Sequence, residues 1–171
     1  DLLTKEQIEK EISRLEAVPE QKRTPEEVRR LEVLKDTRLF DSEYYVFVRN
    51  GKGGRERLSP IIGKNAEQIV ERIRNTPDGE KVWQHVHKCA DIHAYRAEYA
   101  TDIYRKYARP IEEIPYDKVN KGTGKRYQSE VYSCRKDEAG KKLDKVAMLV
   151  CSKALGHNRI SVVADNYIRG L

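Results

Sequence analysis

The sequence predicts an α+β fold that is mainly helical, with a small antiparallel β hairpin or sheet on one edge. Apolar residues recur at helical spacing over most of the chain, and helix start signals precede several of these segments. Only two neighbouring stretches, 43–49 (EYYVFVR) and 55–62 (RERLSPII), have the extended, β-branched and aromatic character of strands. The glycine-rich turn NGKGG separates these two stretches, which favours a hairpin.

Two helices are predicted ahead of this hairpin, within residues 5–38. Each begins with a capping box, in which a threonine and a residue three positions later satisfy each other's backbone donors. The first box pairs Thr4 with Gln7, and the second pairs Thr24 with Glu27. We expect the two helices to form an insertion ahead of the hairpin.

Further helices are expected after the hairpin. Asn65 is predicted to cap one of them, and residues 91–107 form the next. Asp144 is predicted to start a helix that Gly156 ends, and Ser161 to cap a last short helix. The residues of the 91–107 helix that are available for packing are Ile92, Tyr95, Tyr99, Ile103 and Tyr107.

Residues 108–143 form a basic connection that is irregular, with a small hairpin indicated by SEVYSCRKDEAGKKLDK. Its basic side chains either contact phosphates or belong to a solvated loop, and the sequence leaves both readings open. These side chains are Lys118, Lys121, Lys125, Arg126, Arg135, Lys136, Lys141 and Lys142.

Composition limits the class of protein. A chain of 171 residues, 36% of them charged, fits a single soluble domain spanning 1–171, and it has no apolar run close to the length of a membrane span. The net charge of +6 permits a polyanionic partner without establishing one. Three cysteines without metal-ligand spacing are typical of reduced thiols, so we expect a cytoplasmic protein.

Five polar residues stand out as candidates for a common site: Lys52, His93, Arg96, His157 and Tyr167. His93 and Arg96 lie three positions apart on a predicted helix and therefore point the same way. Such a set suits a phosphodiester. Arginine binds the non-bridging oxygens in a bidentate manner, histidines donate to the same oxygens or carry a proton, and a phenol can attack phosphorus.

Each candidate taken alone has an ordinary structural explanation. A lysine in a glycine-rich turn is usually solvated, and a His–Arg pair on a helix is usually a packing or ion-pair feature. His157 could be a core histidine or a donor at a helix end, and Tyr167 is one of ten tyrosines. GKGG lacks the full P-loop pattern and leads into a strand, which argues against nucleotide binding.

The amino-acid sequences of three segments and their order in the chain change this assessment. VFVRNGKGGRERLSPII, DIHAYRAEYAT and SKALGHNRISVVADNYI together resemble the tyrosine recombinase (phage integrase) family, in the form found in integrases of Gram-positive mobile genetic elements. That family carries a hairpin lysine, a His-x-x-Arg box, a Leu-Gly-His box and a tyrosine nine or ten residues later. All four features occur here in that order, over residues 43–107 and 144–169.

The resemblance implies the role of each candidate. Lys52 would be the general acid for the 5′-hydroxyl, and Arg96 and His157 would hold the scissile phosphate. His93 would assist proton transfer, and Tyr167 would form the 3′-phosphotyrosyl link.

One expected residue has no clear match, because the family carries a further phosphate-binding arginine in an Arg-x-x-Glu-Leu box before the hairpin. If LLTKEQI corresponds to the segment after that box, the arginine lies upstream of Asp1. The alternative is Arg29 or Arg30 with Glu32. We prefer the first placement, because Arg29 and Arg30 are expected to face solvent on an amphipathic helix.

For the protein as a whole, the resemblance implies the tyrosine recombinase catalytic-domain fold and site-specific recombination or integration of double-stranded DNA. It also implies a homotetramer on DNA, no membrane association, and no need for ATP, metal or another cofactor. The amino-terminal core-binding domain of the family is expected to lie outside this chain. Two alternatives remain: a catalytically incomplete DNA-binding remnant, and DNA relaxation of the type IB topoisomerase kind.

Overall fold

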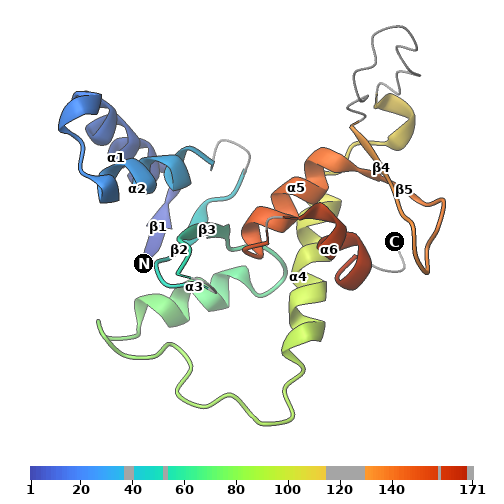
Figure 1. The fold of residues 1–171 in the computed structure, drawn as a ribbon. Helices are drawn as coiled ribbons and strands as arrows, with labels where there is room; N and C mark the ends of the chain where they lie inside the picture. Colours follow the sequence, from blue (N-terminus) through green and yellow to red (C-terminus); the bar gives the residue numbers. More distant parts are fainter. Residues whose placement is uncertain (37–40, 52–53, 115–129, 158, 169–171) are drawn as a thin grey trace, which may run out of the picture. The chain divides into compact units, whose positions relative to one another are not determined.

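The structure is a computed structural model that describes residues 1–36, 41–51, 54–114, 130–157 and 159–168. It is a mixed α and β structure, mainly helical, with a small antiparallel sheet, as the sequence predicts (Figure 1). The elements follow in the order β1 (Leu2–Thr4), α1 (Lys5–Ala17), η1 (Glu20–Lys22), α2 (Pro25–Lys35), β2 (Tyr44–Val48), β3 (Arg57–Pro60), α3 (Ala66–Arg74), α4 (Ile92–Tyr107), η3 (Ile111–Glu113), β4 (Val131–Ser133), β5 (Lys142–Asp144), α5 (Lys145–Ala154) and α6 (Ile160–Asn166).

The chain divides into two compact units, an amino-terminal unit (Asp1–Asp91) and a carboxy-terminal unit (Ile92–Leu171). The single domain expected from the sequence stays a prediction. None of the helices described is long and apolar enough to cross a membrane.

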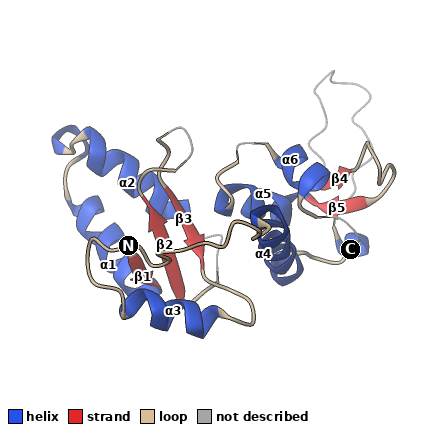
Figure 2. Cartoon of the chain, turned by 90° about the horizontal axis from the view of Figure 1, so that it is seen from below, coloured by secondary structure: helices blue, strands red, loops and turns tan. Residues whose placement is uncertain are grey.

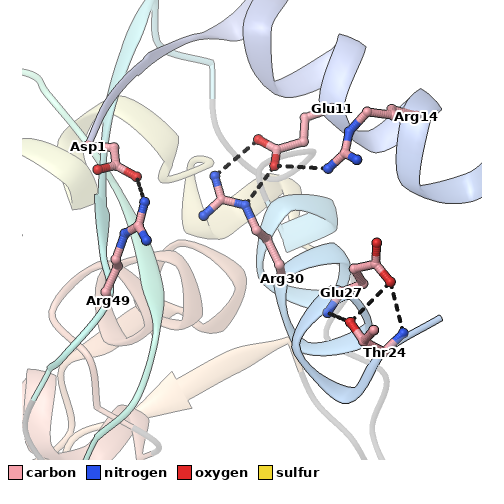
Figure 3. Close-up of polar contacts among 7 residues, drawn as sticks. All are labelled: Asp1, Glu11, Arg14, Thr24, Glu27, Arg30 and Arg49. Carbon is pink, nitrogen blue, oxygen red and sulfur yellow. Dashed lines mark hydrogen bonds and ion pairs between the residues drawn. The ribbon is translucent and has the colours of Figure 1, made fainter.

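The helices α1 and α2 begin as predicted. Thr4 Oγ1 accepts from Gln7 N at 3.2 Å, and the Gln7 side chain accepts from Thr4 N at 2.8 Å. Thr24 and Glu27 form the same reciprocal pair at the start of α2, as Figure 3 shows. These caps satisfy backbone donors that the first turn of a helix cannot pair internally.

The amino-terminal unit contains a three-stranded antiparallel sheet in which β2 lies between β1 and β3 (Figure 2). The hairpin of β2 and β3 was predicted, whereas β1 was not, because three residues are too few to show an alternating pattern. Strand β1 is held by its register with β2, where Leu2 pairs with Val46 and Thr4 with Tyr44. Asn65 precedes α3 as predicted, but its side chain makes no capping hydrogen bond.

In the carboxy-terminal unit, α5 packs against both α4 and α6. The buried side of α4 consists of Ala100, Ile103 and Tyr104, so the face predicted for packing was partly wrong. Ile92 and Tyr95 are 51% and 63% exposed. The small Ala100 lets the two helices approach closely, and the Cys151 thiol of α5 reaches the Ala100 carbonyl at 3.3 Å.

The start of α5 is anchored by a fully buried carboxylate. Asp144 caps the helix by accepting from Val146 N, and it also accepts three hydrogen bonds from the backbone and guanidinium of Arg109. Burial alone would raise the pKa of Asp144, but the hydrogen bonds from Arg109 and Val146 outweigh it and leave the pKa lowered. Tyr104 Oη accepts from Asp144 N at 2.9 Å and so joins α4 to this cluster.

The segment for which the sequence indicates a hairpin forms the antiparallel strands β4 and β5 just before α5. The prediction for the last helix needs a correction. Helix α6 begins at Ile160 after an extended Arg159, so Ser161 lies inside its first turn and is not its cap. The helix ends at Asn166, which makes Tyr167 its C-cap and not a helical residue.

Candidate active site

Three of the five predicted site residues converge in the carboxy-terminal unit: Arg96, His157 and Tyr167. The Arg96 guanidinium lies 3.3 Å from His157 Nε2 through Nη2 and 3.4 Å from Tyr167 Oη through Nε. His157 Nε2 and Tyr167 Oη are themselves 3.4 Å apart. Residues separated by 61 and 71 positions in the chain therefore form one polar cluster.

Arg96 reaches this cluster from the edge of the buried face of α4. It precedes Ala100 by four positions and Ile103 by seven, which places all three on one side of the helix. Its Nη2 donates to the carbonyl of Leu155 at 3.1 Å, at the carboxyl end of α5. Helix ends of this kind carry partial negative charge, so this position stabilises a cation.

His157 is placed by the turn that ends α5. Gly156 adopts φ +76°, a left-handed conformation that glycine accepts without strain. Gly156 N donates to the Lys153 carbonyl at 2.9 Å, and His157 N donates to the Ser152 carbonyl at 2.7 Å. These two bonds make a Schellman motif, which fixes the direction in which the chain leaves the helix. The predicted stop at Gly156 is therefore confirmed.

Tyr167 is held at the end of α6. Its amide donates to the Val163 carbonyl at 3.0 Å, and Val163 and the following Ile168 are both fully buried. The residue is only 8% exposed. Its hydroxyl lies in the cluster, and its ring packs beside the other members. The His157 and Tyr167 ring centroids lie 5.5 Å apart, and Arg96 Cζ lies 5.5 Å from the tyrosine ring centroid.

The electrostatics of the cluster favour an anion. Within the described part of the chain, no carboxylate lies within ion-pair distance of Arg96. Its contacts are a carbonyl, an imidazole and a phenol, which orient the guanidinium without neutralising it. A partly buried cation without a carboxylate among its described contacts can gain from an oxyanion, which brings charge and several acceptors together.

The other two predicted site residues are His93 and Lys52. His93 is exposed in the first turn of α4, one turn before Arg96, and in the regions described no hydrogen bond or ion pair joins it to the cluster. Lys52 lies outside the described residues. The roles of both therefore stay predictions.

The alternative arginines of α2 differ from each other. Arg29 is exposed as expected, but Arg30 is not. Its Nε and Nη2 donate to the two carboxylate oxygens of Glu11 at 2.7 and 3.1 Å (Figure 3). Its guanidinium also lies 4.3 Å from the Phe47 ring centroid. The prediction of solvent-facing arginines was wrong for Arg30, because its neighbours lie on α1 and β2. The pattern of apolar residues within α2 carries no information about those two elements.

The structure describes only some of the basic residues of 108–143. Lys118, Lys121, Lys125 and Arg126 lie outside the described residues, and Arg135 is exposed. Lys136 pairs with Asp165 of α6 at 2.7 Å, and Lys141 pairs with Glu138 at 3.0 Å. These two lysines already have carboxylate partners, which weakens the prediction that they contact phosphate.

Ser152 and the Leu155 carbonyl also support the cluster, and neither was predicted. Ser152 is 1% exposed, and its hydroxyl donates to the His157 carbonyl at 2.9 Å. The helix-ending Gly156 was the available signal, since a Schellman motif fixes which residue lies opposite His157. A backbone carbonyl leaves no signal in the sequence.

The described residues contain no group of three or more histidine, cysteine or acidic side chains arranged to hold a metal ion. No protein-family model, curated protein or solved structure matches the chain. Function must therefore be inferred from the three converging side chains and their surroundings.

Proposed function

We propose that this chain is the catalytic domain of a tyrosine recombinase, which cuts and rejoins DNA at specific sites through a 3′-phosphotyrosyl intermediate. The observation that carries the proposal is the meeting of a guanidinium, an imidazole and a tyrosine hydroxyl, with no carboxylate beside the guanidinium in the regions that the structure describes. The sequence motifs that bear these groups occur in the order of that family. The recombinase catalytic fold is part of the same proposal.

The cluster suits the proposed reaction step by step. The Tyr167 oxygen attacks phosphorus, a new O–P bond forms, and the bond from phosphorus to the 5′ oxygen breaks. Arg96 and His157 donate to the non-bridging oxygens and so stabilise the charge that develops on them. The phenolic proton leaves with the help of His93, and the departing 5′ oxygen takes a proton from Lys52. Both of these last assignments rest on the family resemblance.

Strand cleavage and rejoining need no further reactant. Each cleavage exchanges one phosphate ester for another, so attack by a 5′-hydroxyl on the phosphotyrosine restores the DNA and the free phenol. We propose double-stranded DNA as the substrate, a homotetramer as the working assembly, and the cytoplasm as the location.

A second phosphate-binding arginine belongs to the proposal but not to the cluster. Arg30 is a poor candidate, since Glu11 already neutralises it. Arg29 is free of this objection but is exposed on the same helix. We therefore keep the placement upstream of Asp1.

An alternative follows from one observation: Arg96 is the single arginine in the cluster as described. A site with one guanidinium could bind DNA without cleaving it, which would make the chain a DNA-binding remnant. A type IB topoisomerase would share the covalent step but would relax supercoiled DNA without a specific site. Only covalent attachment to DNA separates the first alternative from the proposal.

The test uses duplexes of random sequence in which one strand ends in a 3′-phosphate esterified to p-nitrophenol. This leaving group departs without a general acid, so the test does not depend on Lys52. The wild-type chain should form a complex that survives SDS, with release of one p-nitrophenolate per complex. Tyr167→Phe should form none, whereas Tyr95→Phe, at an exposed tyrosine, should behave as wild type.

Two results would count against the proposal. A complex that persists in Tyr167→Phe would exclude this tyrosine as the nucleophile. DNA binding by the wild-type chain without any covalent complex would favour the remnant instead.

A further inference from the structure

The end of α5 holds His157 through two hydrogen bonds to a single residue. Ser152 accepts from the His157 amide at 2.7 Å through its carbonyl, and donates to the His157 carbonyl at 2.9 Å through its hydroxyl. The first bond is part of any Schellman motif and needs no particular side chain. The second depends on the serine hydroxyl.

A serine is not the residue that this turn usually favours. In a Schellman motif, the residue at the position of Ser152 commonly makes an apolar contact with the one at the position of His157. Ser152 is instead 1% exposed among buried neighbours such as Val150 and Cys151. A buried hydroxyl is costly unless it is hydrogen-bonded, and the His157 carbonyl provides its partner.

The same turn also orients Arg96. The Leu155 carbonyl, which accepts from Arg96 Nη2, lies between Ser152 and His157 in the chain. One short segment therefore determines where the imidazole and the guanidinium lie relative to each other. A change in this segment should reach both groups without removing either.

We infer that Ser152 is a positioning residue, whose hydroxyl fixes the His157 main chain so that the imidazole meets Arg96 and Tyr167. The effect of this role on catalysis rests on the proposed function, whereas its effect on the position of His157 does not. Ser152 does not touch the reacting atoms. It acts through His157.

The main variant is Ser152→Ala. Alanine favours helix more than serine does, so α5 should persist and the loss should be confined to the hydroxyl. Ser152→Cys nearly keeps the size of the side chain but exchanges a strong donor for a weak one, and it carries the test if the alanine variant does not fold. The matched control is Val150→Ala, a buried residue of α5 whose side chain has no hydrogen-bonding group.

The structural readout is the NMR signal of the His157 ring, assigned among the four histidines by substitution. In an otherwise wild-type chain, Tyr167→Phe should shift this signal, because Tyr167 Oη lies 3.4 Å from Nε2. In the Ser152→Ala background, the same substitution should shift it much less. The Val150→Ala background should retain the full shift.

The catalytic readout is the rate of covalent complex formation on p-nitrophenyl duplexes at saturating DNA. Ser152→Ala should lower this rate by about 10- to 100-fold with unchanged DNA affinity, because a misplacement of about 1 Å is enough for such a loss. Ser152→Cys should lie between the alanine variant and wild type. Val150→Ala should react at the wild-type rate below its unfolding temperature.

The two readouts separate this inference from the proposed function. A full Tyr167→Phe shift in the Ser152→Ala background, or a wild-type rate of complex formation there, would overturn the positioning role. If the wild-type chain forms no covalent complex but Ser152→Ala uncouples the ring signal, the recombinase proposal fails while the positioning of His157 by Ser152 stands.

Discussion

Arg30 in the amino-terminal unit and Arg96 in the carboxy-terminal unit have opposite surroundings. Arg30 makes a two-point ion pair with Glu11 (Figure 3) and lies over the Phe47 ring. Arg96 is held by the Leu155 carbonyl, the His157 ring and the Tyr167 hydroxyl, none of which is a carboxylate. The first arrangement completes an interaction within the fold. The second leaves Arg96 without a carboxylate partner among the residues that the structure describes.

Arg109 shows that this difference does not follow from the unit in which an arginine lies. It belongs to the carboxy-terminal unit, as Arg96 does, yet it pairs with Asp144 and Glu130. These partners raise the pKa of Arg109 above its already high ordinary value, with the Asp144 hydrogen bonds as the largest cause. Local charge compensation is therefore the feature that distinguishes a structural arginine from a candidate functional one.

The largest expected effect is that of Arg96→Gln on covalent complex formation. Removal of a donor to a developing oxyanion typically lowers the rate by about 10²- to 10³-fold. The unfolding free energy should change little in comparison, because no ion pair is lost. Rates on the p-nitrophenyl duplexes and urea unfolding curves give the two quantities. A wild-type rate in this variant would remove Arg96 from the site.

Arg30→Gln should show the reverse pattern. It should lower the unfolding free energy by about 2 kcal/mol, a typical value for hydrogen bonds to a charged group that is largely buried. The rate of complex formation by the folded protein should stay at the wild-type value. A large loss of rate without a loss of stability would instead make Arg30 the missing phosphate-binding arginine.

Asp144→Asn tests the ion pair of Arg109, the arginine of the carboxy-terminal unit that has carboxylate partners. The pKa of Asp144 is lowered in the folded state, so its carboxylate contributes stability above the unfolded pKa of about 3.9, which is lost as the pH falls through the folded-state pKa. Asparagine can still cap α5, but it cannot pair with Arg109, so we expect a loss of about 1–2 kcal/mol at pH 7. Unfolding curves between pH 7 and pH 2 should also fall less steeply in the variant. An unchanged slope would contradict this assignment.

The smallest expected effects are those of alanine at two glycines. They separate the cost of backbone strain from the effect of the turn on the position of His157. Gly140 and Gly156 both have left-handed φ values, +88° and +76°. Replacement of either by alanine should cost about 1 kcal/mol of stability, the usual penalty for a side chain in this conformation. Gly140→Ala, where a Cβ meets nothing within 4 Å, should react at the wild-type rate. Gly156→Ala should lower the rate as well, because it disturbs the turn before His157. Equal rates in both variants would show that this turn does not matter for the site.

Local signals predicted much of the fold. The capping boxes at Thr4 and Thr24, the cap at Asp144 and the stop at Gly156 depend on residues close in the chain, and all four appear as expected. The packing face of α4 and the pairing of Arg30 depend on distant segments, and both predictions needed correction. One local prediction also failed, because Arg159 and not Ser161 precedes the first residue of α6. Strand β1 was missed for the same reason, since only its pairing with β2 defines it.

The same difference between local signals and contacts of distant segments applies to the candidate site. The helical spacing of His93 and Arg96 predicted a shared face, but α4 presents Arg96 to the cluster and leaves His93 exposed. The meeting of Arg96, His157 and Tyr167 could be expected only from a family resemblance, because no local pattern links segments so far apart. The contributions of Ser152 and the Leu155 carbonyl depend on the detailed geometry of one turn, which the sequence alone does not specify.

The central claim is that the Arg96 guanidinium holds a DNA phosphate for attack by Tyr167. The most direct measurement is mass spectrometry of the covalent complex after digestion by protease and nuclease. We predict a nucleotide 3′-phosphate attached to the peptide that contains Tyr167 in the wild-type chain, and a strong loss of that peptide adduct in Arg96→Gln. An adduct on any other residue, or an equal yield in Arg96→Gln, would contradict the claim.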